Sequence, residues 1–321
     1  MSTMIALVGE QSQPNFIPVL HYNPNCVIFV YTTKTDTIYK NQKMVLEKRK
    51  IKVYGIQTDP YNIAAIVKAL NERLAKIAKE SDEIAQSLKS LVFNLTGGTK
   101  IMSLAAYQVA AQLKAPVIYF QSDKGRSIVD YYSWQDHQLI RQQQEELPEY
   151  LHLEDVLELH LGPRKDPNGG EMWNVKRPAR LSGDGHKLEL AIAQVLNDHG
   201  YEALCGVEDH NGQLDIDVMI RYLNQIGIIE AKAPEKGAVT DIVGVQQLSA
   251  ARNFLKGTYT HQFWVINGKP STNQQMVCKL LGIHLISLPH YKRGTSTLSQ
   301  EEINILLPAI DEVMKVKTHK S

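Results

Sequence analysis

Two short apolar segments in direct succession constrain this chain more than any other feature of its sequence. The stretch from Gly212 to Pro234 reads GQLDIDVMIRYLNQIGIIEAKAP, which predicts two consecutive β-strands. Side chains two residues apart on a strand point to the same face, so Asp215 lies on the same face as Asp217, and Glu230 on the same face as Lys232. If the strands pair, carboxylates and an ammonium group converge at one polar spot beside an apolar core.

These residue types suit a site for a divalent cation. Hard cations such as Mn²⁺ and Mg²⁺ prefer oxygen ligands, and a bound cation neutralises phosphate charge and activates water for phosphodiester cleavage. We expect Asp217 and Glu230 to bind the metal, with the backbone carbonyl of Ala231 as a further ligand. Lys232 would orient or deprotonate the water and stabilise the transition state. The alternative is an exposed strand face with a cross-strand salt bridge.

An amphipathic helix is predicted just before these strands, from His186 to Glu202, because apolar residues recur at helical spacing. Glu189 lies near its start. A carboxylate there either complements the helix dipole or reaches the metal. We expect the second role, because this helix leads directly into the two strands. The glycine-rich stretch from Gly206 to Gly212 is predicted to be the connecting turn.

The order of these elements resembles that of the PD-(D/E)xK nuclease superfamily. Five residues match its pattern position by position: Glu189, Asp217, Glu230, Ala231 and Lys232. The proline that gives the motif its name is absent, since Ile216 precedes Asp217. A further helix is expected from Ala238 to Lys256, with Gln246 and Gln247 either supporting the site or lying on the helix surface. The resemblance implies that the catalytic residues are Glu189, Asp217, Glu230 and Lys232, and that the metal ligands are Glu189, Asp217, Glu230 and Ala231.

A second motif lies in the first half of the chain. An apolar strand from Leu91 to Leu95 is followed by the sequence TGGTK, residues 96–100, and then by a helix. Two glycines let the backbone approach a ligand closely, and a helix N-terminus favours an anion. The spacing fits neither a P-loop nor a dinucleotide-binding fingerprint. The alternative is a tight turn that binds nothing.

The surrounding sequence supports a ligand site at the edge of a sheet. Strands are predicted at Ile5–Val8, Val27–Tyr31 and Ile51–Ile56, alternating with helices, as in a doubly wound parallel sheet. Ligands bind beyond the carboxyl ends of such strands. The polar and glycine residues at those ends are the predicted ligand-binding set: Gly9, Gln11, Ser12, Thr32, Thr33, Thr96, Gly97, Gly98, Thr99 and Lys100.

This half resembles the CARF (CRISPR-associated Rossmann-like) domain, on the basis of its TGGTK turn. The resemblance implies binding of a cyclic oligoadenylate, with cyclic tetra-adenylate favoured. A CARF half followed by a PD-(D/E)xK half resembles the layout of the cyclic-oligoadenylate-activated CRISPR ancillary nucleases, which implies a homodimer that cleaves DNA, RNA or both once the ring binds. The expected fold class is α/β, with an N-terminal Rossmann-like CARF domain built on a mostly parallel sheet and a C-terminal restriction-endonuclease-like α/β domain. A type III CRISPR defence role follows from the same resemblance.

Composition fits a two-domain protein of the cytoplasm. The chain has 321 residues, and its small positive net charge comes from an excess of lysine and arginine in the first 140 residues. No apolar run is long enough to span a membrane, no leader peptide is evident, and three scattered cysteines are expected to be reduced. The predicted domains are residues 1–145 for ligand sensing and 181–321 for cleavage, with 146–180 as a linker.

Two other functions remain compatible with the sequence. The chain could be a cyclic-nucleotide sensor whose second half binds nucleic acid without cleaving it. Alternatively, it could be a restriction-like or repair-like nuclease that no cyclic activator controls. Whether the first domain degrades its own ligand is open, although Lys100 and the adjacent threonines could support such chemistry.

Overall fold

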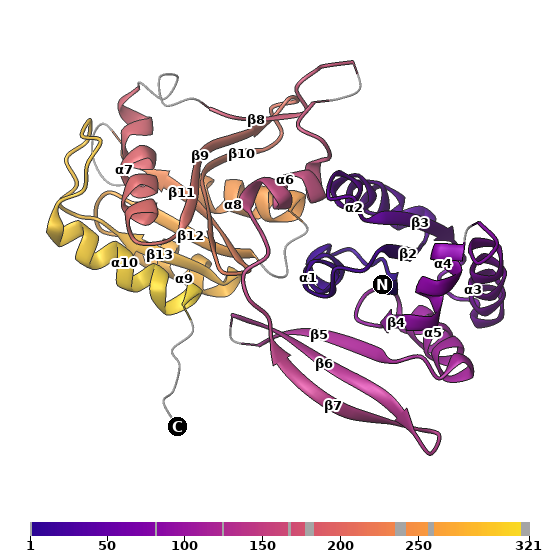
Figure 1. Cartoon of the computed structure of the whole chain (residues 1–321). Helices are drawn as coiled ribbons and strands as arrows, with labels where there is room; N and C mark the ends of the chain where they lie inside the picture. The colour runs from indigo at the N-terminus through magenta and orange to yellow at the C-terminus, as the bar shows by residue number, and fades with distance from the viewer. Residues whose placement is uncertain are drawn as a thin grey trace. The chain divides into compact units, whose positions relative to one another are not determined.

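The computed structural model divides into two compact units, Met1–Tyr150 and Leu151–Ser321 (Figure 1). It describes residues 2–80, 82–123, 125–165, 168–176, 183–234, 242–255 and 260–315. Among the described residues, no helix is both long enough and apolar enough to cross a membrane.

The first unit is built on a seven-stranded sheet with strand order β3-β2-β1-β4-β5-β6-β7. Strands β1 to β5 are parallel to one another, whereas β6 pairs antiparallel with β5 and β7 antiparallel with β6. The strands are β1 (Thr3–Leu7), β2 (Cys26–Tyr31), β3 (Lys52–Gln57), β4 (Leu91–Asn94), β5 (Val117–Asp123), β6 (Arg126–Gln135) and β7 (Gln138–Glu146). The helices are α1 (Gln13–Tyr22), α2 (Asp36–Lys48), α3 (Ile63–Ile77), α4 (Asp82–Ser87) and α5 (Lys100–Leu113), with short 3₁₀ turns at Thr33–Thr35 and Leu88–Ser90.

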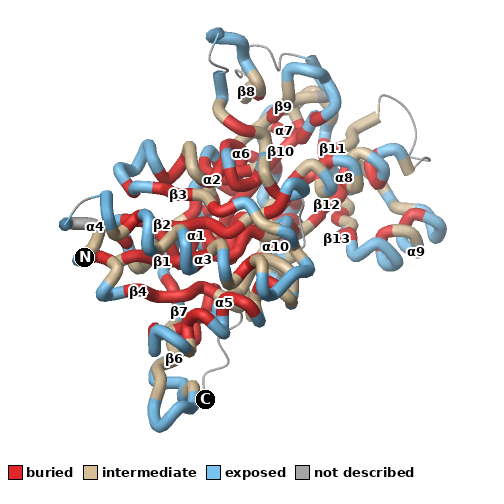
Figure 2. Tube along the Cα trace, turned by 90° about the vertical axis from the view of Figure 1, so that its right-hand side faces the viewer, coloured by how far each residue is buried: buried red, intermediate tan, exposed pale blue. Residues whose placement is uncertain are grey.

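The expectation of a mostly parallel sheet in a Rossmann-like unit is therefore confirmed. Strands β1 and β4 are buried along their whole length, as is β2 apart from its last residue (Figure 2). They are continuous apolar runs because a parallel sheet is covered by helices on both faces. On one face, Ile66 and Leu70 of α3 and Met102 of α5 pack onto these strands.

The order of the strands places a topological switch point at β1. The chain moves from β1 to β2 on one side, while β4 occupies the other side of β1. The connections after β1 and β4 therefore leave the sheet in opposite directions at the carboxyl ends of the two strands. Ligands of doubly wound proteins bind beyond the strand ends at such a switch point.

The second unit contains a six-stranded sheet with strand order β13-β12-β11-β10-β9-β8. Strands β11, β12 and β13 are parallel, and the remaining pairs are antiparallel. The strands are β8 (Trp173–Val175), β9 (Glu202–Asp209), β10 (Asp215–Tyr222), β11 (Gln225–Lys232), β12 (Thr260–Ile266) and β13 (Ile283–Ser287). The helices are α6 (Leu153–Leu161), α7 (Asp184–Asp198), α8 (Val243–Phe254), α9 (Thr272–Leu281) and α10 (Gln300–Met314). The stretch expected to be a linker thus contains α6 and β8.

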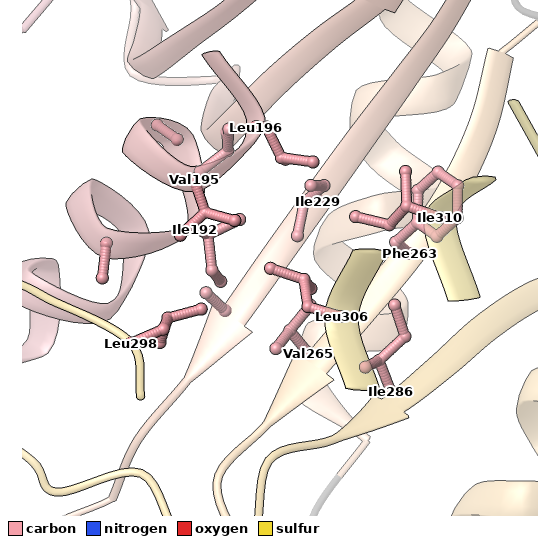
Figure 3. Packing of buried hydrophobic residues seen from close by; sticks show 14 of the residues in the cluster. Ile192, Val195, Leu196, Ile229, Phe263, Val265, Ile286, Leu298, Leu306 and Ile310 are labelled. Atoms are coloured by element: carbon pink, nitrogen blue, oxygen red, sulfur yellow. The ribbon is translucent and has the colours of Figure 1, made fainter. Parts of the chain in front are cut away.

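Helices α7 and α10 hold the two-strand motif in place. Ile192 and Leu196 of α7 and Leu306 of α10 belong to the same apolar cluster as Ile229 and Phe263 of the sheet (Figure 3). Burying large aliphatic side chains contributes about 1.5–3 kcal/mol each, so this cluster fixes α7 against the strands. Pairing of the two predicted strands, β10 and β11, is confirmed.

The region before β10 differs from the prediction. The helix predicted to reach Glu202 ends at Asp198, because Gly200 adopts a φ of 85°, which stops the helix. Glu202 instead begins β9, and this strand includes the stretch from Gly206 that was expected to be a turn. The turn itself is closed by Asp209, whose Oδ1 accepts hydrogen bonds from the backbone N–H groups of Gln213 and Leu214.

The helix predicted from Ala238 to Lys256 is observed as α8, Val243–Phe254. Residues 235–241 and 256–259 lie outside the described residues, as does the C-terminal segment 316–321. Gln246 is exposed on α8, and Gln247 is half-buried.

Candidate functional site

The predicted acidic residues meet where the pairing of β10 and β11 ends. Val218 pairs with Ile229 at the end of the register. Asp217 precedes Val218 on β10 and Glu230 follows Ile229 on β11, so both acidic residues lie next to this last pair. The backbone N–H of Ala231 donates a 2.7 Å hydrogen bond to Oδ2 of Asp217. Ile229 and Ala231 belong to the apolar core. Because successive side chains on a strand point to opposite faces, Glu230 lies on the face opposite to theirs. Both carboxylates are buried, with Glu230 only 2% exposed.

Helix α7 contributes the third carboxylate. Glu189 is buried beside the sheet, and its Oε1 lies 2.9 Å from Nδ1 of His186. Its Oε2 lies 4.0 Å from Sγ of Cys205 on β9. Burial and the negative charges of Asp217, Asp215 and Glu230 raise the pKa of Glu189 to about 8. The structure therefore brings Glu189 into the same electrostatic cluster as the two strand carboxylates.

The other two carboxylates also resist ionisation. Burial, followed by the charge of Asp217, raises the pKa of Glu230 to about 8. Burial raises the pKa of Asp217 as well, although the ammonium of Lys232 and the Ala231 hydrogen bond oppose the rise. Removing a carboxylate from water disfavours its charged form unless cations or donors compensate. The cluster thus contains more negative charge than its surroundings offset.

Lys232 supplies part of the missing positive charge. Its Nζ lies 2.5 Å from Oε1 of Glu230. Burial lowers the pKa of Lys232, but the charges of Glu230 and Asp217 outweigh that effect and the pKa is raised. Lys232 is therefore an ammonium group at neutral pH. Such a group can donate hydrogen bonds and stabilise negative charge, but it cannot accept a proton.

Sequence reasoning missed a second cation at this centre. Nζ of Lys176, just after β8, lies 3.0 Å from Oδ1 of Asp215 and 3.2 Å from Oε2 of Glu208. Burial lowers the pKa of Lys176, but the hydrogen bond to Asp215 and the nearby negative charges give a net rise. Nothing in the local sequence around Lys176 marks it, because a three-residue edge strand brings it to the site. Asp215, on the same strand as Asp217, was visible in the sequence pattern.

The donor chemistry of this cluster fits a divalent cation. Oε1 of Glu230 is buried and has no hydrogen-bond partner of good geometry in the described part of the chain, although the Lys232 ammonium is close. Three buried carboxylates with unfavourable ionisation are the oxygen ligands that Mg²⁺ and Mn²⁺ prefer. However, the described residues contain no group of three acidic, histidine or cysteine side chains already arranged to hold a metal. The residues suit the ion, but in their present rotamers Glu230 is paired with Lys232, and Glu189 with His186.

The glycines predicted to bind a ligand in the first unit lie in direct contact. A Cβ atom on Gly97 would lie 2.0 Å from the carbonyl oxygen of Leu7, at the end of β1. A Cβ atom on Gly9 would lie 3.1 Å from the backbone nitrogen of Gly98, which has a φ of 73°. The connections after β1 and β4 can pack this closely only with glycine. The structure therefore brings Gly9, Gly97 and Gly98 together at the switch point.

The two threonines of the TGGTK turn use their hydroxyl groups inside the protein. Oγ1 of Thr96 donates to Oδ1 of Asn94 at 2.6 Å and accepts from the N–H of Phe120 at 2.7 Å. Oγ1 of Thr99 donates to the Pro60 carbonyl at 2.8 Å and accepts from the Met102 N–H, which caps α5. These hydroxyls shape the turn, so in this geometry they are not free donors for a ligand.

The other predicted ligand residues differ in exposure. Lys100, the first residue of α5, is exposed, and so is Thr33, which accepts a 3.1 Å hydrogen bond from Gln57. Thr32 is buried and caps the following 3₁₀ turn. Gln11 is half-buried after β1. Ser12 is fully buried, and its hydroxyl has no hydrogen-bond partner among the described residues.

Comparison with known proteins identifies the first unit. Residues 3–150, a little under half of the chain, match the family model of the Card1 CARF domain. The first unit is a CARF domain. In this unit, the TGGTK turn packs against the end of β1. No curated protein matches the chain.

Three solved structures share the fold of most or all of the chain. Can2 from Sulfobacillus thermosulfidooxidans, in complex with cyclic tetra-adenylate, is 16% identical with a TM-score of 0.69, over 98% of this chain and 99% of Can2. Protein VC1899 from Vibrio cholerae is 15% identical with a TM-score of 0.70, over 98% of both chains. A type III CRISPR defence DNA nuclease activated by cyclic oligoadenylate is 18% identical with a TM-score of 0.58, over 95% of this chain and 51% of that one. The structural similarity therefore covers the second unit as well as the first.

Proposed function

We propose that this protein is a metal-dependent endonuclease that a cyclic oligoadenylate activates in type III CRISPR defence. The observation that carries this proposal is the convergence of Glu189, Asp217 and Glu230 with the Lys232 ammonium, in a chain that begins with a CARF domain. The two similar structures whose ligand or activator is a cyclic oligoadenylate support it. We propose further that the C-terminal unit has a restriction-endonuclease-like fold and that two copies of the chain act together.

In this proposal, Glu189, Asp217 and Glu230 hold Mn²⁺ or Mg²⁺, with the Ala231 carbonyl as an additional oxygen ligand. The metal would supply charge neutralisation on the phosphate and activation of the attacking water. The N–H of Ala231 keeps the Asp217 carboxylate at the end of β10 through its 2.7 Å hydrogen bond. The buried position of Glu230 excludes water from that side of the cluster.

Lys232 serves the reaction as a cation in this scheme. Because its pKa is raised, its ammonium group orients the attacking water and stabilises the charge that develops on the phosphate. The sequence had left open whether Lys232 deprotonates the water. A protonated lysine favours the electrostatic role.

For the first unit, we propose that the ring binds beyond the carboxyl ends of β1 and β4. Its phosphates would face the turn at Gly97–Gly98 and the N-terminus of α5, where backbone N–H groups and the Lys100 ammonium favour anions. The internally bonded hydroxyls of Thr96 and Thr99 would hold this turn in shape rather than contact the ring directly.

The test is cleavage of supercoiled plasmid and of a labelled single-stranded RNA with Mn²⁺, with and without cyclic tetra-adenylate. Cleavage only in the presence of the ring is the expected result. Cleavage without the ring would support the nuclease activity but contradict its activation by a cyclic oligoadenylate. No cleavage of either substrate, with ring binding intact in a direct binding assay, would favour a sensor that does not cut.

A further inference from the structure

We infer that Lys176 is a second cation of the proposed nuclease centre, positioned by Gly206 to bind a phosphate group of the nucleic-acid substrate. This inference rests on the proposed function and adds a residue that the motif does not contain. Lys176 is distant in sequence from both acidic strands, and only the sheet brings it to the site.

The backbone fixes the position of Lys176 first. Its N–H donates a 2.8 Å hydrogen bond to the carbonyl of Gly206, which continues the pairing of β8 with β9. Gly206 has a φ of 67°, a left-handed backbone conformation that glycine adopts without strain. The register of β9 with β10 has the same offset on both sides of Gly206, so the strand pairing does not shift there.

Gly206 also leaves room for the aliphatic part of the lysine. A Cβ atom at this position would lie 3.0 Å from Cβ and Cδ of Lys176 and 3.2 Å from its Cγ. The stem of the lysine therefore lies directly over the glycine, and only 19% of the side chain is exposed. A stem held in this way loses little conformational freedom when the ammonium group binds a ligand.

The ammonium group lies at the rim of the acidic cluster. Its partners, Asp215 and Glu208, have side chains that are 55% and 36% exposed, so this pair of contacts faces solvent. Ion pairs at such positions contribute little net stability, and a lysine exchanges partners there at small cost. The stem is thus held firmly, while the charged end is free to change from a carboxylate to a phosphate.

The charge of the centre explains why such a cation is needed. Five carboxylates surround the proposed centre: Glu189, Asp215, Asp217, Glu230 and Glu208. Among the described side chains that contact them, the lysines are Lys176 and Lys232, and the imidazole of His186 lies beside Glu189. The exposed carboxylates of Asp215 and Glu208 repel an approaching phosphodiester unless positive charge lies beside them. Lys232 is paired with the buried Glu230, whereas both carboxylate partners of Lys176 are open to solvent.

The experiment measures binding of a fluorescein-labelled single-stranded RNA, and of the same sequence as DNA, to the full-length protein with cyclic tetra-adenylate and EDTA. Lys176→Gln removes the charge but keeps most of the stem. We expect about tenfold weaker binding at low salt, and a decrease of about 0.7 in the slope of log affinity against log salt, the value for one phosphate contact on a single strand. Lys176→Arg should keep both values near those of the wild type.

The matched control is Lys279→Gln, which removes an exposed lysine from α9 in the same unit. It should leave the salt dependence unchanged. If Lys176→Gln lowers the melting temperature but keeps the wild-type slope, Lys176 only ties β8 to β10, and the inference is wrong. If the wild type binds neither nucleic acid and cleaves none, the proposed function itself fails and this inference fails with it.

Discussion

The backbone N–H of Ala231 donates its hydrogen bond to Asp217 across the end of the β10–β11 pair, at 2.7 Å. A hydrogen bond to a carboxylate is stronger than one between neutral groups and favours the charged form. It therefore holds Asp217 beside Glu230 although burial opposes the charge of both. One main-chain contact thus joins the two halves of the acidic motif.

The first prediction concerns the chemistry of the second unit. Glu230→Gln and Lys232→Ala should each reduce ring-activated cleavage by about 100-fold or more, because Glu230 is a proposed metal ligand and Lys232 is proposed to stabilise charge on the phosphate. Binding of cyclic tetra-adenylate should be unchanged, since the CARF domain is a separate unit. Cleavage of labelled RNA and plasmid measures the first effect, and isothermal titration with the ring measures the second.

Glu312→Gln is the matched control for the carboxylate, because Glu312 is an exposed residue of α10. It should leave cleavage unchanged. Persistence of cleavage in both Glu230→Gln and Lys232→Ala would show that the reaction centre lies elsewhere.

The second prediction concerns the dependence of stability on pH. The folded protein raises the pKa of Glu189 and of Glu230 from 4.5 to about 8. Between these values it binds more protons than the unfolded chain, so the free energy of unfolding should fall as the pH rises from about 4.5 to about 8. The slope is at most about 1.4 kcal/mol per pH unit for each proton retained. Urea unfolding in EDTA across this range measures it.

Two comparisons sharpen this test. Glu230→Gln should flatten the pH dependence, because its amide does not titrate. Added Mn²⁺ should stabilise the protein more at pH 8 than at pH 6, since metal binding requires ionised carboxylates. A pH-independent free energy of unfolding in the wild type would contradict the proposed charge state of the cluster.

The third prediction concerns the ligand edge of the CARF domain. Lys100→Ala should weaken cyclic tetra-adenylate binding by about tenfold, the loss of one charge-assisted contact. Its melting temperature should stay the same, because Lys100 is exposed. Lys79→Ala, at an exposed position after the C-terminal end of α3, is the charge-matched control. Equal affinity of the wild type and Lys100→Ala for cyclic tetra-adenylate would show that Lys100 does not contribute to ring binding.

The fourth prediction concerns the packing of the TGGTK turn. Gly97→Ala should destabilise the protein by about 3 kcal/mol, because a new Cβ would lie 2.0 Å from the Leu7 carbonyl oxygen and the backbone would have to move. That oxygen also accepts a 2.8 Å hydrogen bond from Asn15 Nδ2, which should be strained as well. Urea unfolding provides the measurement. Gly183→Ala, whose Cβ would only reach 3.7 Å from His186, should change stability little. Equal urea midpoints for Gly97→Ala and Gly183→Ala would show that the turn has room for a side chain at position 97.

Local patterns predicted the elements that carry the site. Alternation along residues 215–232 predicted two strands with Asp217 and Glu230 on polar positions, and these strands pair as expected. Apolar periodicity predicted the helix that carries Glu189, although its end was wrong because the stop at Gly200 depends on a left-handed backbone conformation. The glycines of the TGGTK turn indicate that a ligand can approach closely, which stays a prediction; the structure shows that they also allow close approach to the protein's own backbone at Leu7.

The sequence by itself determined which elements form, because periodicity and turn residues act between neighbours along the chain. Only the tertiary structure determined which charged side chains from different elements lie close together. The positions of Lys176 over Gly206 and of Cys205 beside Glu189 depend on which strands lie next to each other in the sheet. The raised pKa of Glu189 likewise arises from burial and from carboxylates on other elements. Such effects act through space, so no local sequence pattern contains them.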